Sequence, residues 1–560
     1  MSLTRRTAIG LAAAGGLLAA DVKPKPGQPA SPKRRLLFNW DGSVIHCWGK
    51  TTIPNANGPL TRAQFTSLAF TPLENAGVDT VLFSFGSGNV AEYQSNVLEW
   101  PGQADEFEFP KSRTWHGGGL EFDPKDQYLN PKSMADAGHN PPLVVVEECH
   151  KRGLTAFVSL RMNDTHDGQH TRGTLPNPEL PTFKRLNPDW LVENLDRWSA
   201  LDYRRPQVRA WKLKIIEEYF DRWDFDGIEL DWLRHTLNFA RGTEKESAKY
   251  LTEFMRSVRK SLQARAAKRG RPIEIAVRVP EQMEWCLLGG YDVPAWISED
   301  LIDMLILGQG LTDLPSLQEF RAVMKGRSLP IYPCLYPYGN GYAVSPDEVI
   351  RASAANLWRG GADGIYTFNW HHYGTWRQSI LSEIGNPQKL ARKNKHYVLT
   401  HRFDAGRSAG TDYLRFNTPY RDRNALVPFE LNVADGLKSV ALSVAEIPAK
   451  AELWISLEHS EPGDALTVMV NGKALELAGA PVDGRWQTIG YEVHLPPGNG
   501  TIGLPATNKV DMRFSGLRWQ LPANVVVAGS NTVSIRLDKR GKGAEFLLKV
   551  ERVELFASAV

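Results

Sequence analysis

Short apolar segments with the composition of β-strands recur between residue 35 and residue 370, and a polar loop and an amphipathic helix follow most of them. This alternation is typical of a parallel β-sheet covered by helices. Helices are expected over residues 206–223 and 244–268, where apolar residues recur at helical spacing. Eight segments are predicted as strands: RLLFNW (35–40), TVLFSF (80–85), TAFVSL (155–160), GIELDW (227–232), IEIAVRV (273–279), IDMLIL (302–307), PIYPCL (330–335) and GIYTFNW (364–370).

Eight strands of this kind favour a (β/α)₈ TIM barrel over residues 35–385. The largest insertion follows the second strand, over about residues 86–140, and is rich in Gly, Pro, Trp and Asp. Such a composition is typical of a long loop region over the mouth of a barrel. A doubly wound α/β sheet is the alternative that the same alternation allows.

The pattern changes near residue 390, where helical spacing stops and alternating strands separated by Gly, Pro and Asn turns begin. Residues 395–560 are therefore predicted to form an all-β sandwich. The segment TVMVNGKALEL contains the hairpin signal Asn471-Gly472 and, together with VVAGSNTVSIRL, resembles the galactose-binding-like jelly rolls appended to many glycoside hydrolases. The resemblance implies a jelly-roll sandwich. It leaves two roles open, carbohydrate binding and structural packing on the barrel.

The N-terminal segment predicts export. Arg5-Arg6 precede a short apolar run that ends in small residues within residues 1–20, which is typical of a signal peptide. The arginine pair resembles a twin-arginine signal, although Ala8 and Gly10 keep the Sec route open. Residues 21–34 are basic and rich in Pro, as in a solvated linker. No later segment is long and apolar enough to span a membrane, so a periplasmic or secreted protein is expected.

Composition narrows the possible functions. The net charge of +3 over 560 residues argues against a nucleic-acid-binding protein, which concentrates basic residues on one face. The 17 Trp residues suit stacking against sugar rings. The four Cys residues have no zinc-binding spacing, and neither a phosphate-binding loop nor a dinucleotide fingerprint is present. Kinases and NAD enzymes are therefore excluded, and no cofactor is expected.

The fourth predicted strand carries the strongest chemical signal, in the sequence FDGIELDWLRH. Because side chains alternate along a strand, Glu229 and Asp231 are expected to point together into the barrel. Two inward carboxylates are costly to bury unless they are paired or used in catalysis. Arg234 and His235 follow in the next loop, where they can orient a ligand or hold Asp231 ionised. A structural ion pair with Arg161 or Arg278 is the alternative role for these carboxylates.

This region resembles a known family. It is similar to glycoside hydrolase-like barrels of the family-10-like group, which are related in design to α-amylase-type barrels. The similarity lies in LDY at 201–203, PQVR at 206–209, the helix that follows, and FDGIELDWLRH. The resemblance covers about residues 35–380. It implies a nucleophilic or charge-stabilising carboxylate at the end of strand four, which maps onto Asp231. The segment PIYPCLYPYG departs from the arrangement with glutamates on strands four and seven, because it contains no acid.

The second carboxylate that glycoside hydrolysis requires is predicted after the fifth strand. The sequence RVPEQMEW places Glu281 and Glu284 at or just beyond the strand end, with Arg278 inside the strand. Glu281 is the preferred proton donor because it lies closer to the strand. Both acids could instead lie on the rim or cap a helix.

Polar side chains also follow three other strands, where they are typical of hydrogen-bonding partners of sugar hydroxyls or of a uronate. The arginines of the predicted site point to an anionic substrate, although arginines in barrels also neutralise catalytic acids. The candidates are Asn39 and Asp41 after the first strand, Arg161, Asn163, Asp164 and His166 after the third, and Trp370, His371 and His372 after the eighth.

These features together predict an exported glycoside hydrolase that uses Asp231, Glu281 and Glu229 to cleave a polysaccharide or oligosaccharide. Three alternatives remain: a polysaccharide lyase that uses His166 with Arg161, a non-catalytic carbohydrate-binding protein, and a metal enzyme with histidines above the barrel. The last is disfavoured because no HxH or HExxH spacing occurs.

Overall fold

The structure is a computed structural model of the chain. The predicted signal segment and nearly all of the predicted linker lie outside the residues that it describes. The described residues are 34–43, 45–46, 59–103, 113–115, 120–122, 126–168, 179–192, 198–308, 314–335, 346–368, 370, 378–400, 429–475, 487–494 and 509–559.

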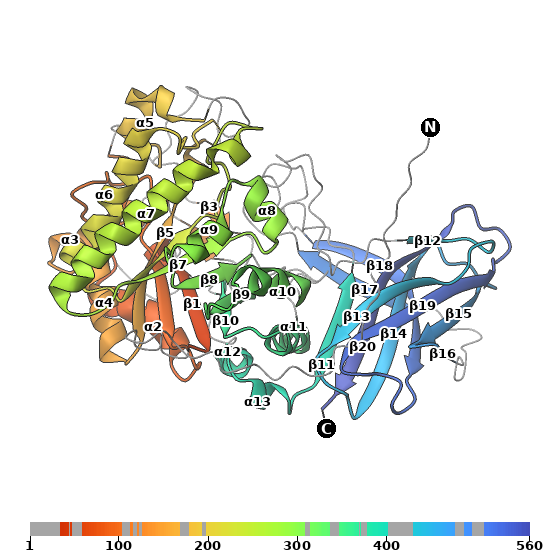
Figure 1. The fold of residues 1–560 in the computed structure, drawn as a ribbon. Helices are drawn as coiled ribbons and strands as arrows, with labels where there is room; N and C mark the ends of the chain where they lie inside the picture. Colours follow the sequence, from red (N-terminus) through yellow and green to blue (C-terminus); the bar gives the residue numbers. More distant parts are fainter. Residues whose placement is uncertain are drawn as a thin grey trace, which may run out of the picture.

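Eight parallel strands close into a barrel in the order β1-β10-β9-β8-β7-β6-β5-β2 (Figure 1). This closed sheet confirms the predicted TIM barrel and excludes a doubly wound sheet, which is open. Each of the eight predicted segments coincides with one of the strands, although β1 and β5 extend one residue beyond the predicted end. The strands are β1 (Leu36–Asp41), β2 (Thr80–Ser84), β5 (Thr155–Arg161), β6 (Gly227–Asp231), β7 (Glu274–Val279), β8 (Met304–Leu307), β9 (Ile331–Leu335) and β10 (Ile365–Thr367).

Helices surround the barrel, and local sequence explains several of their ends. Thr61 and Gln64 form a capping box at the start of α2, and Pro206 occupies the first turn of α6, where its missing N–H costs nothing. Gly270 ends α7 in the left-handed conformation that glycine adopts most easily. The helices between consecutive strands are α2 (Arg62–Phe70), α4 (Pro141–Lys151), α6 (Pro206–Arg222), α7 (Glu244–Arg269), α9 (Val293–Ser298), α10 (Leu314–Val323), α11 (Asp347–Arg359) and α12 (Gln378–Ile384).

Further short elements lie within the connections. The connection after β2 contains a two-stranded hairpin and a helix, in the region where the sequence predicts the largest insertion. The hairpin and helix after β2 are β3 (Arg113–Trp115), β4 (Leu120–Phe122) and α3 (Asp126–Asp136). Later connections contain α5 (Thr182–Leu186), α8 (Met283–Leu288) and α13 (Pro387–Leu390), and 3₁₀ turns occur at Thr71–Leu73, His166–Gly168 and Pro188–Trp190.

Alternation along the strands separates an apolar layer outside the barrel from a mixed interior. Ile228 and Leu230 of β6 are buried in the layer between strands and helices. Glu229 and Asp231 consequently point inward, as predicted, and both are buried. The lower interior is filled by large apolar side chains, which include Phe157, and the polar side chains gather toward the carboxyl ends of the strands.

The described residues from 395 onward form two antiparallel sheets, which confirms the predicted β-sandwich. Alternate residues of the two sheets enclose one apolar core. One sheet contains β11 (Lys395–Thr400), β12 (Phe429–Leu431), β14 (Lys450–Glu458), β17 (Gln487–His494), β18 (Lys509–Gln520) and β20 (Leu548–Ser558), and the other β13 (Lys438–Val444), β15 (Ala465–Val470), β16 (Lys473–Ala474) and β19 (Gly529–Lys539).

The sandwich packs against α11 of the barrel (Figure 1). Ala352 of α11 contributes to the apolar core of the sandwich. Asn356 donates to the carbonyl of Ser443 at 3.0 Å, and Arg359 donates to the carbonyls of Ala445 and Ala528. These bonds satisfy backbone carbonyls near the ends of β13 and β19, so the sandwich lies beside the barrel wall.

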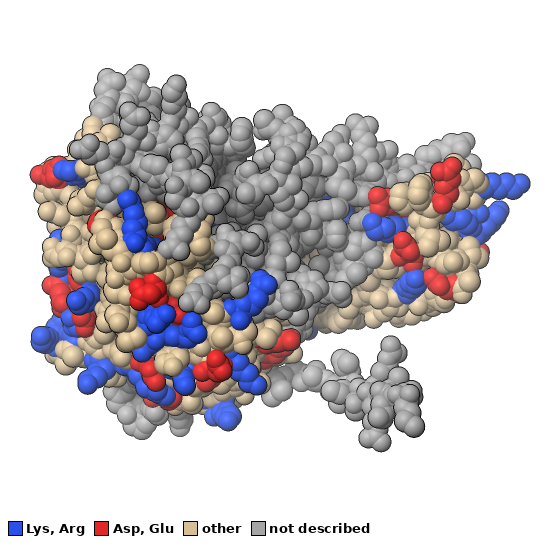
Figure 2. Space-filling model, turned by 90° about the horizontal axis from the view of Figure 1, so that it is seen from above, with Lys and Arg blue, Asp and Glu red and all other residues tan. Residues whose placement is uncertain are grey.

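Charged side chains of both signs are interspersed on the face of the barrel seen in Figure 2. This mixture agrees with the small net charge of the chain. Among the described helices, none has the length and apolar character needed to cross a bilayer.

Candidate active site

A buried polar layer lies inside the barrel around Glu229. Asn39 donates to Glu229 Oε2 at 3.0 Å and to Ser159 Oγ at 3.2 Å. The hydroxyl of Tyr366 donates to the other oxygen, Oε1, at 2.8 Å. All four side chains are almost fully buried. Asn39 and Glu229, both predicted as site residues, therefore meet in the structure, one layer below the ends of the strands.

The environment of Glu229 changes its protonation. Burial, followed by the negative charge of Asp231, raises the pKa of Glu229 to about 7, and the nearby charge of Arg278 opposes this rise. Glu229 therefore exchanges its proton near neutral pH, from a position without direct access to solvent.

Asp231 lies above Glu229 at the end of β6 and forms a buried ion pair. Arg278 donates through Nη1 to Asp231 Oδ2 at 3.1 Å. The second carboxylate oxygen accepts from the backbone N–H groups of Leu233 at 3.0 Å and Arg234 at 3.1 Å. The guanidinium of Arg278 also lies 3.8 Å from the centre of the Phe368 ring. Asp231 is thus held at both oxygens, as a positioned carboxylate must be.

Glu281 reaches the same region from the loop after β7 and is buried. Its carboxylate lies against Gly308, where a Cβ atom would come within 2.7 Å of Glu281 Oε2. The carbonyl of Gly308 in turn accepts from Nε of Arg278 at 3.3 Å. Gly308 has φ +78°, so this position suits glycine in both space and conformation.

The thiol of Cys334 is affected by all three predicted catalytic carboxylates. Burial, together with the charges of Glu281, Glu229 and Asp231 and against the effect of Arg278, raises its pKa to about 12. The charges of the three carboxylates therefore act on the same part of the barrel interior.

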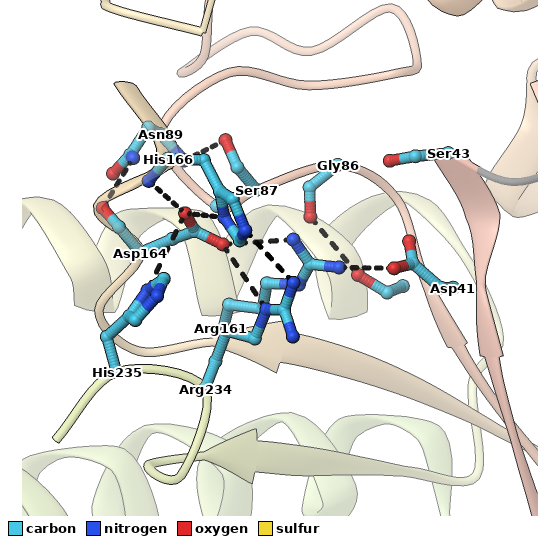
Figure 3. A network of polar contacts seen from close by, with 12 residues as sticks. Asp41, Ser43, Gly86, Ser87, Asn89, Arg161, Asp164, His166, Arg234 and His235 are labelled. Carbon is cyan, nitrogen blue, oxygen red and sulfur yellow. Dashed lines mark hydrogen bonds and ion pairs between the residues drawn. The ribbon is translucent and has the colours of Figure 1, made fainter. Parts of the chain in front are cut away.

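A second polar network lies beside the first, at the ends of β1 and β5 (Figure 3). Arg161 donates to Asp41 Oδ2 at 2.7 Å and to Asp164 Oδ2 at 2.9 Å. Burial disfavours the ionised form of Asp164, but the electrostatic interaction and the hydrogen bond with His166, followed by the charge of Arg161, outweigh burial and hold the pKa of that carboxyl well below its usual range. Arg161 is consequently neutralised by two acids.

Asp164 orients His166. The Oδ1 atom of Asp164 lies 2.6 Å from His166 Nδ1 and also accepts from the His166 backbone N–H at 2.8 Å. On the other side of the ring, Arg234 Nη2 lies 3.1 Å from His166 Nε2. Because a guanidinium can only donate, Nε2 accepts, and the imidazole proton lies on Nδ1. Asp164, His166 and Arg234 therefore form an ordered chain of donors and acceptors.

His235 completes this network and bears on whether it holds a metal ion. One potential ligand atom from each of Asp164, His166 and His235 lies within 4.8 Å of the others. However, His235 Nδ1 accepts from the backbone N–H of Thr165 at 3.1 Å, and His166 Nε2 accepts from Arg234. Donated hydrogen bonds and a neighbouring cation fit a hydrogen-bonded network better than a metal site.

Other predicted residues have different surroundings. The amide of Asn163 donates to the carbonyls of Leu201 and Leu237 and accepts from the N–H of Leu201, so it ties two loops together. Trp370 is 2% exposed in the apolar layer outside the strands and presents no ring face to a sugar. Glu284 is exposed in the first turn of α8. His371 and His372 lie outside the described residues.

Lys212 is a buried site residue that sequence reasoning missed. From α6 it donates to the carbonyls of Gly88 at 2.8 Å and Arg161 at 3.2 Å, which joins the loop after β2 to the end of β5. Burial, with repulsion from Lys184, lowers its pKa to about 7. A signal existed, because Lys212 interrupts the apolar stripe of its helix at helical spacing between Val208 and Ile215.

Comparison of the sequence with curated proteins finds distant relatives. The chain is 23% identical over 215 residues to the glycosyl hydrolase DigH of Escherichia coli K12 and of Shigella flexneri, a region that covers 36% of this chain and 42% of each relative. No family model matches the chain.

Among solved structures, the glycoside hydrolase domain of PgaB (BpsB) from Bordetella bronchiseptica is 11% identical, with a TM-score of 0.39 and coverage of 63% of this chain and 99% of that one. A family GH18 chitinase from Chromobacterium violaceum is also 11% identical, with a TM-score of 0.35 and coverage of 93% and 91%. The assignment of the fold rests on the pairing of the strands.

The raised pKa of Glu229 predicts a stability change with pH. The pKa of Glu229 is about 7 in the folded protein, above its ordinary value of 4.5. The stabilisation that Glu229 adds to the free energy of unfolding is therefore complete below pH 4.5 and is lost as the pH rises through 7. Glu229→Gln should remove this dependence, which amounts to at most about 1.4 kcal/mol per pH unit. Urea unfolding between pH 4.5 and 7.5 measures it. Glu253→Gln, at a half-exposed position, should keep the wild-type slope, and an equal slope in Glu229→Gln would contradict the assignment.

Proposed function

We propose that this protein is a glycoside hydrolase in which Asp231 and Glu281 are the two catalytic carboxylates. The observation that carries the proposal is their convergence on Arg278 and Gly308 at the carboxyl end of the barrel, where TIM-barrel enzymes have their active sites. Glycoside hydrolysis needs one carboxyl group as proton donor and a second as nucleophile or base. The similarity to proteins named glycosyl hydrolase DigH supports the same class of reaction.

The contacts of each acid suggest its role. Asp231, held by Arg278 and two backbone N–H groups, is the carboxylate that attacks the anomeric carbon or activates water. Glu281 gives its proton to the glycosidic oxygen as the bond between that oxygen and the anomeric carbon breaks. Water then supplies hydroxide to the anomeric carbon. Its remaining proton goes to Glu281 if Asp231 is the nucleophile; if Asp231 is the base, Asp231 takes that proton and exchange with solvent restores both acids. Glu229, buried below, adjusts the charge around Asp231.

A second candidate function is a polysaccharide lyase, which the Asp164–His166–Arg234 network favours. A lyase needs a base that removes the proton next to a uronate carboxylate and a cation that neutralises that carboxylate. His166 is oriented by Asp164 and lies 3.1 Å from Arg234. In this reaction Nε2 of His166, released as Arg234 pairs with the uronate, takes the C5 proton, a C4–C5 double bond forms, the C4–O bond breaks, and solvent supplies the proton to the leaving oxygen.

The proposal includes export of the protein to the periplasm or the medium, because residues 1–20 have the pattern of a signal peptide. An exported enzyme would meet extracellular or cell-envelope glycans. The C-terminal sandwich, if it binds carbohydrate, would keep the barrel close to such a polymer.

Asp231→Asn and Glu281→Gln should each lower the rate of glycan cleavage at least about a hundredfold, because each removes one of two groups that the reaction requires. A reducing-end assay over neutral and acidic polysaccharides measures this. Asp136→Asn, at an exposed position on α3, is the control and should cleave as the wild type does. If both site variants cleave normally while folded, the carboxylate assignment is wrong.

The lyase alternative makes a separate prediction. Elimination creates an unsaturated uronate that absorbs at roughly 235 nm, whereas the products of hydrolysis do not absorb there. For a hydrolase we expect new reducing ends without this absorbance, and little effect of His166→Gln on chemistry at Asp231. Absorbance that grows with cleavage and disappears in His166→Gln would establish the lyase instead.

A further inference from the structure

Three arginines line the candidate site, and they differ in how their charges are compensated. Arg161 bridges two carboxylates at 2.7 and 2.9 Å, and Arg278 pairs with one at 3.1 Å. For Arg234 the nearest carboxylate oxygen is Oδ2 of Asp164, at 4.0 Å, which already accepts from Arg161. Among the described residues, Arg234 is therefore the arginine of the three whose charge lacks a directly bonded acid.

The hydrogen bonding of Arg234 is also incomplete. Within the described part of the chain, its guanidinium makes one hydrogen bond, from Nη2 to His166 Nε2, although the group carries five N–H donors. The Nε atom is buried without a partner. The side chain is nevertheless 24% exposed, and that of His166 is 27% exposed, so this pair is reachable from solvent.

We propose that Arg234, together with the imidazole of His166, forms a subsite for an anionic sugar substituent, a carboxylate or a sulfate ester. This inference rests on the proposed action on carbohydrate and names the class of substrate. An oxyanion would accept from the unused guanidinium donors and supply the charge that Arg234 lacks. His166, fixed by Asp164, would form one wall of the subsite.

The electrostatics of this network agree with an anionic ligand. Burial, followed by repulsion from Arg161, lowers the pKa of Arg234, so its cation is held at a cost. A bound anion would relieve this cost, whereas a neutral sugar would not. Of the arginines that the sequence predicts in the site, Arg234 is therefore the candidate for anion binding, because Arg161 and Arg278 already form ion pairs with acids.

Binding of three monosaccharides tests the subsite: glucuronate, glucose 6-sulfate and glucose, with dissociation constants measured by ligand-observed NMR. We expect the wild type to bind at least one anionic sugar about tenfold or more tightly than glucose, as a charged hydrogen bond provides. A preference for glucuronate identifies a carboxylate, and one for glucose 6-sulfate identifies a sulfate ester. Arg234→Met should abolish the preference, and Arg234→Lys should keep part of it. Arg256→Met, at an exposed arginine on α7, should behave as the wild type does.

Two results would overturn the proposal: no preference for an anionic sugar in the wild type, or a preference that survives in Arg234→Met. Glu281→Gln separates this test from that of the hydrolase, because it removes a proposed catalytic carboxylate that lies against Gly308, and it should keep the anion preference. A preference that persists while no glycan is cleaved would refute the hydrolase and leave the subsite standing. Cleavage of neutral glycans by a protein that does not prefer anionic sugars would support the hydrolase and refute the subsite.

Discussion

The buried ion pair between Arg278 and Asp231 is the constraint on which the candidate site depends. Both side chains lie inside a closed barrel, where an unpaired charge is costly, so each requires the other. Arg278 is fixed further by the Phe368 ring and the carbonyl of Gly308. This arrangement aims Asp231 toward the barrel mouth and brings the loop that carries Glu281 close to it. Burial of the pair therefore links packing inside the barrel to the position of both proposed catalytic acids.

The same constraint divides the acids of the site by their protonation and their partners. Glu229 lies below Asp231 and has a pKa of about 7, because burial and the negative charge of Asp231 outweigh the opposing effect of Arg278. Asp164, in the adjacent network, stays ionised through its hydrogen bonds and Arg161. Acids of two adjacent networks thus differ in their protonation, which is the condition for separate roles in an acid–base mechanism.

The sequence predicted the barrel strands better than the contacts of the individual side chains. Alternation of apolar residues located all eight barrel strands and the inward direction of Glu229 and Asp231, since both follow from local geometry. It did not indicate that Asn163 binds backbone at Leu201 and Leu237, or that Trp370 is buried outside the strands, because those contacts join distant segments. Lys212 was visible only as a break in an apolar stripe.

A double-mutant cycle tests the central ion pair most directly, with Asp231→Asn, Arg278→Met and the combined variant compared by free energy of unfolding in urea. Each single change should cost about 3 kcal/mol or more, because it leaves one buried partner without its hydrogen-bonded counterpart. The combined variant should then lose at least about 1 kcal/mol less than the sum of the single losses. Losses that add to within about 0.5 kcal/mol would contradict the account, because they would mean that Arg278 and Asp231 do not depend on each other.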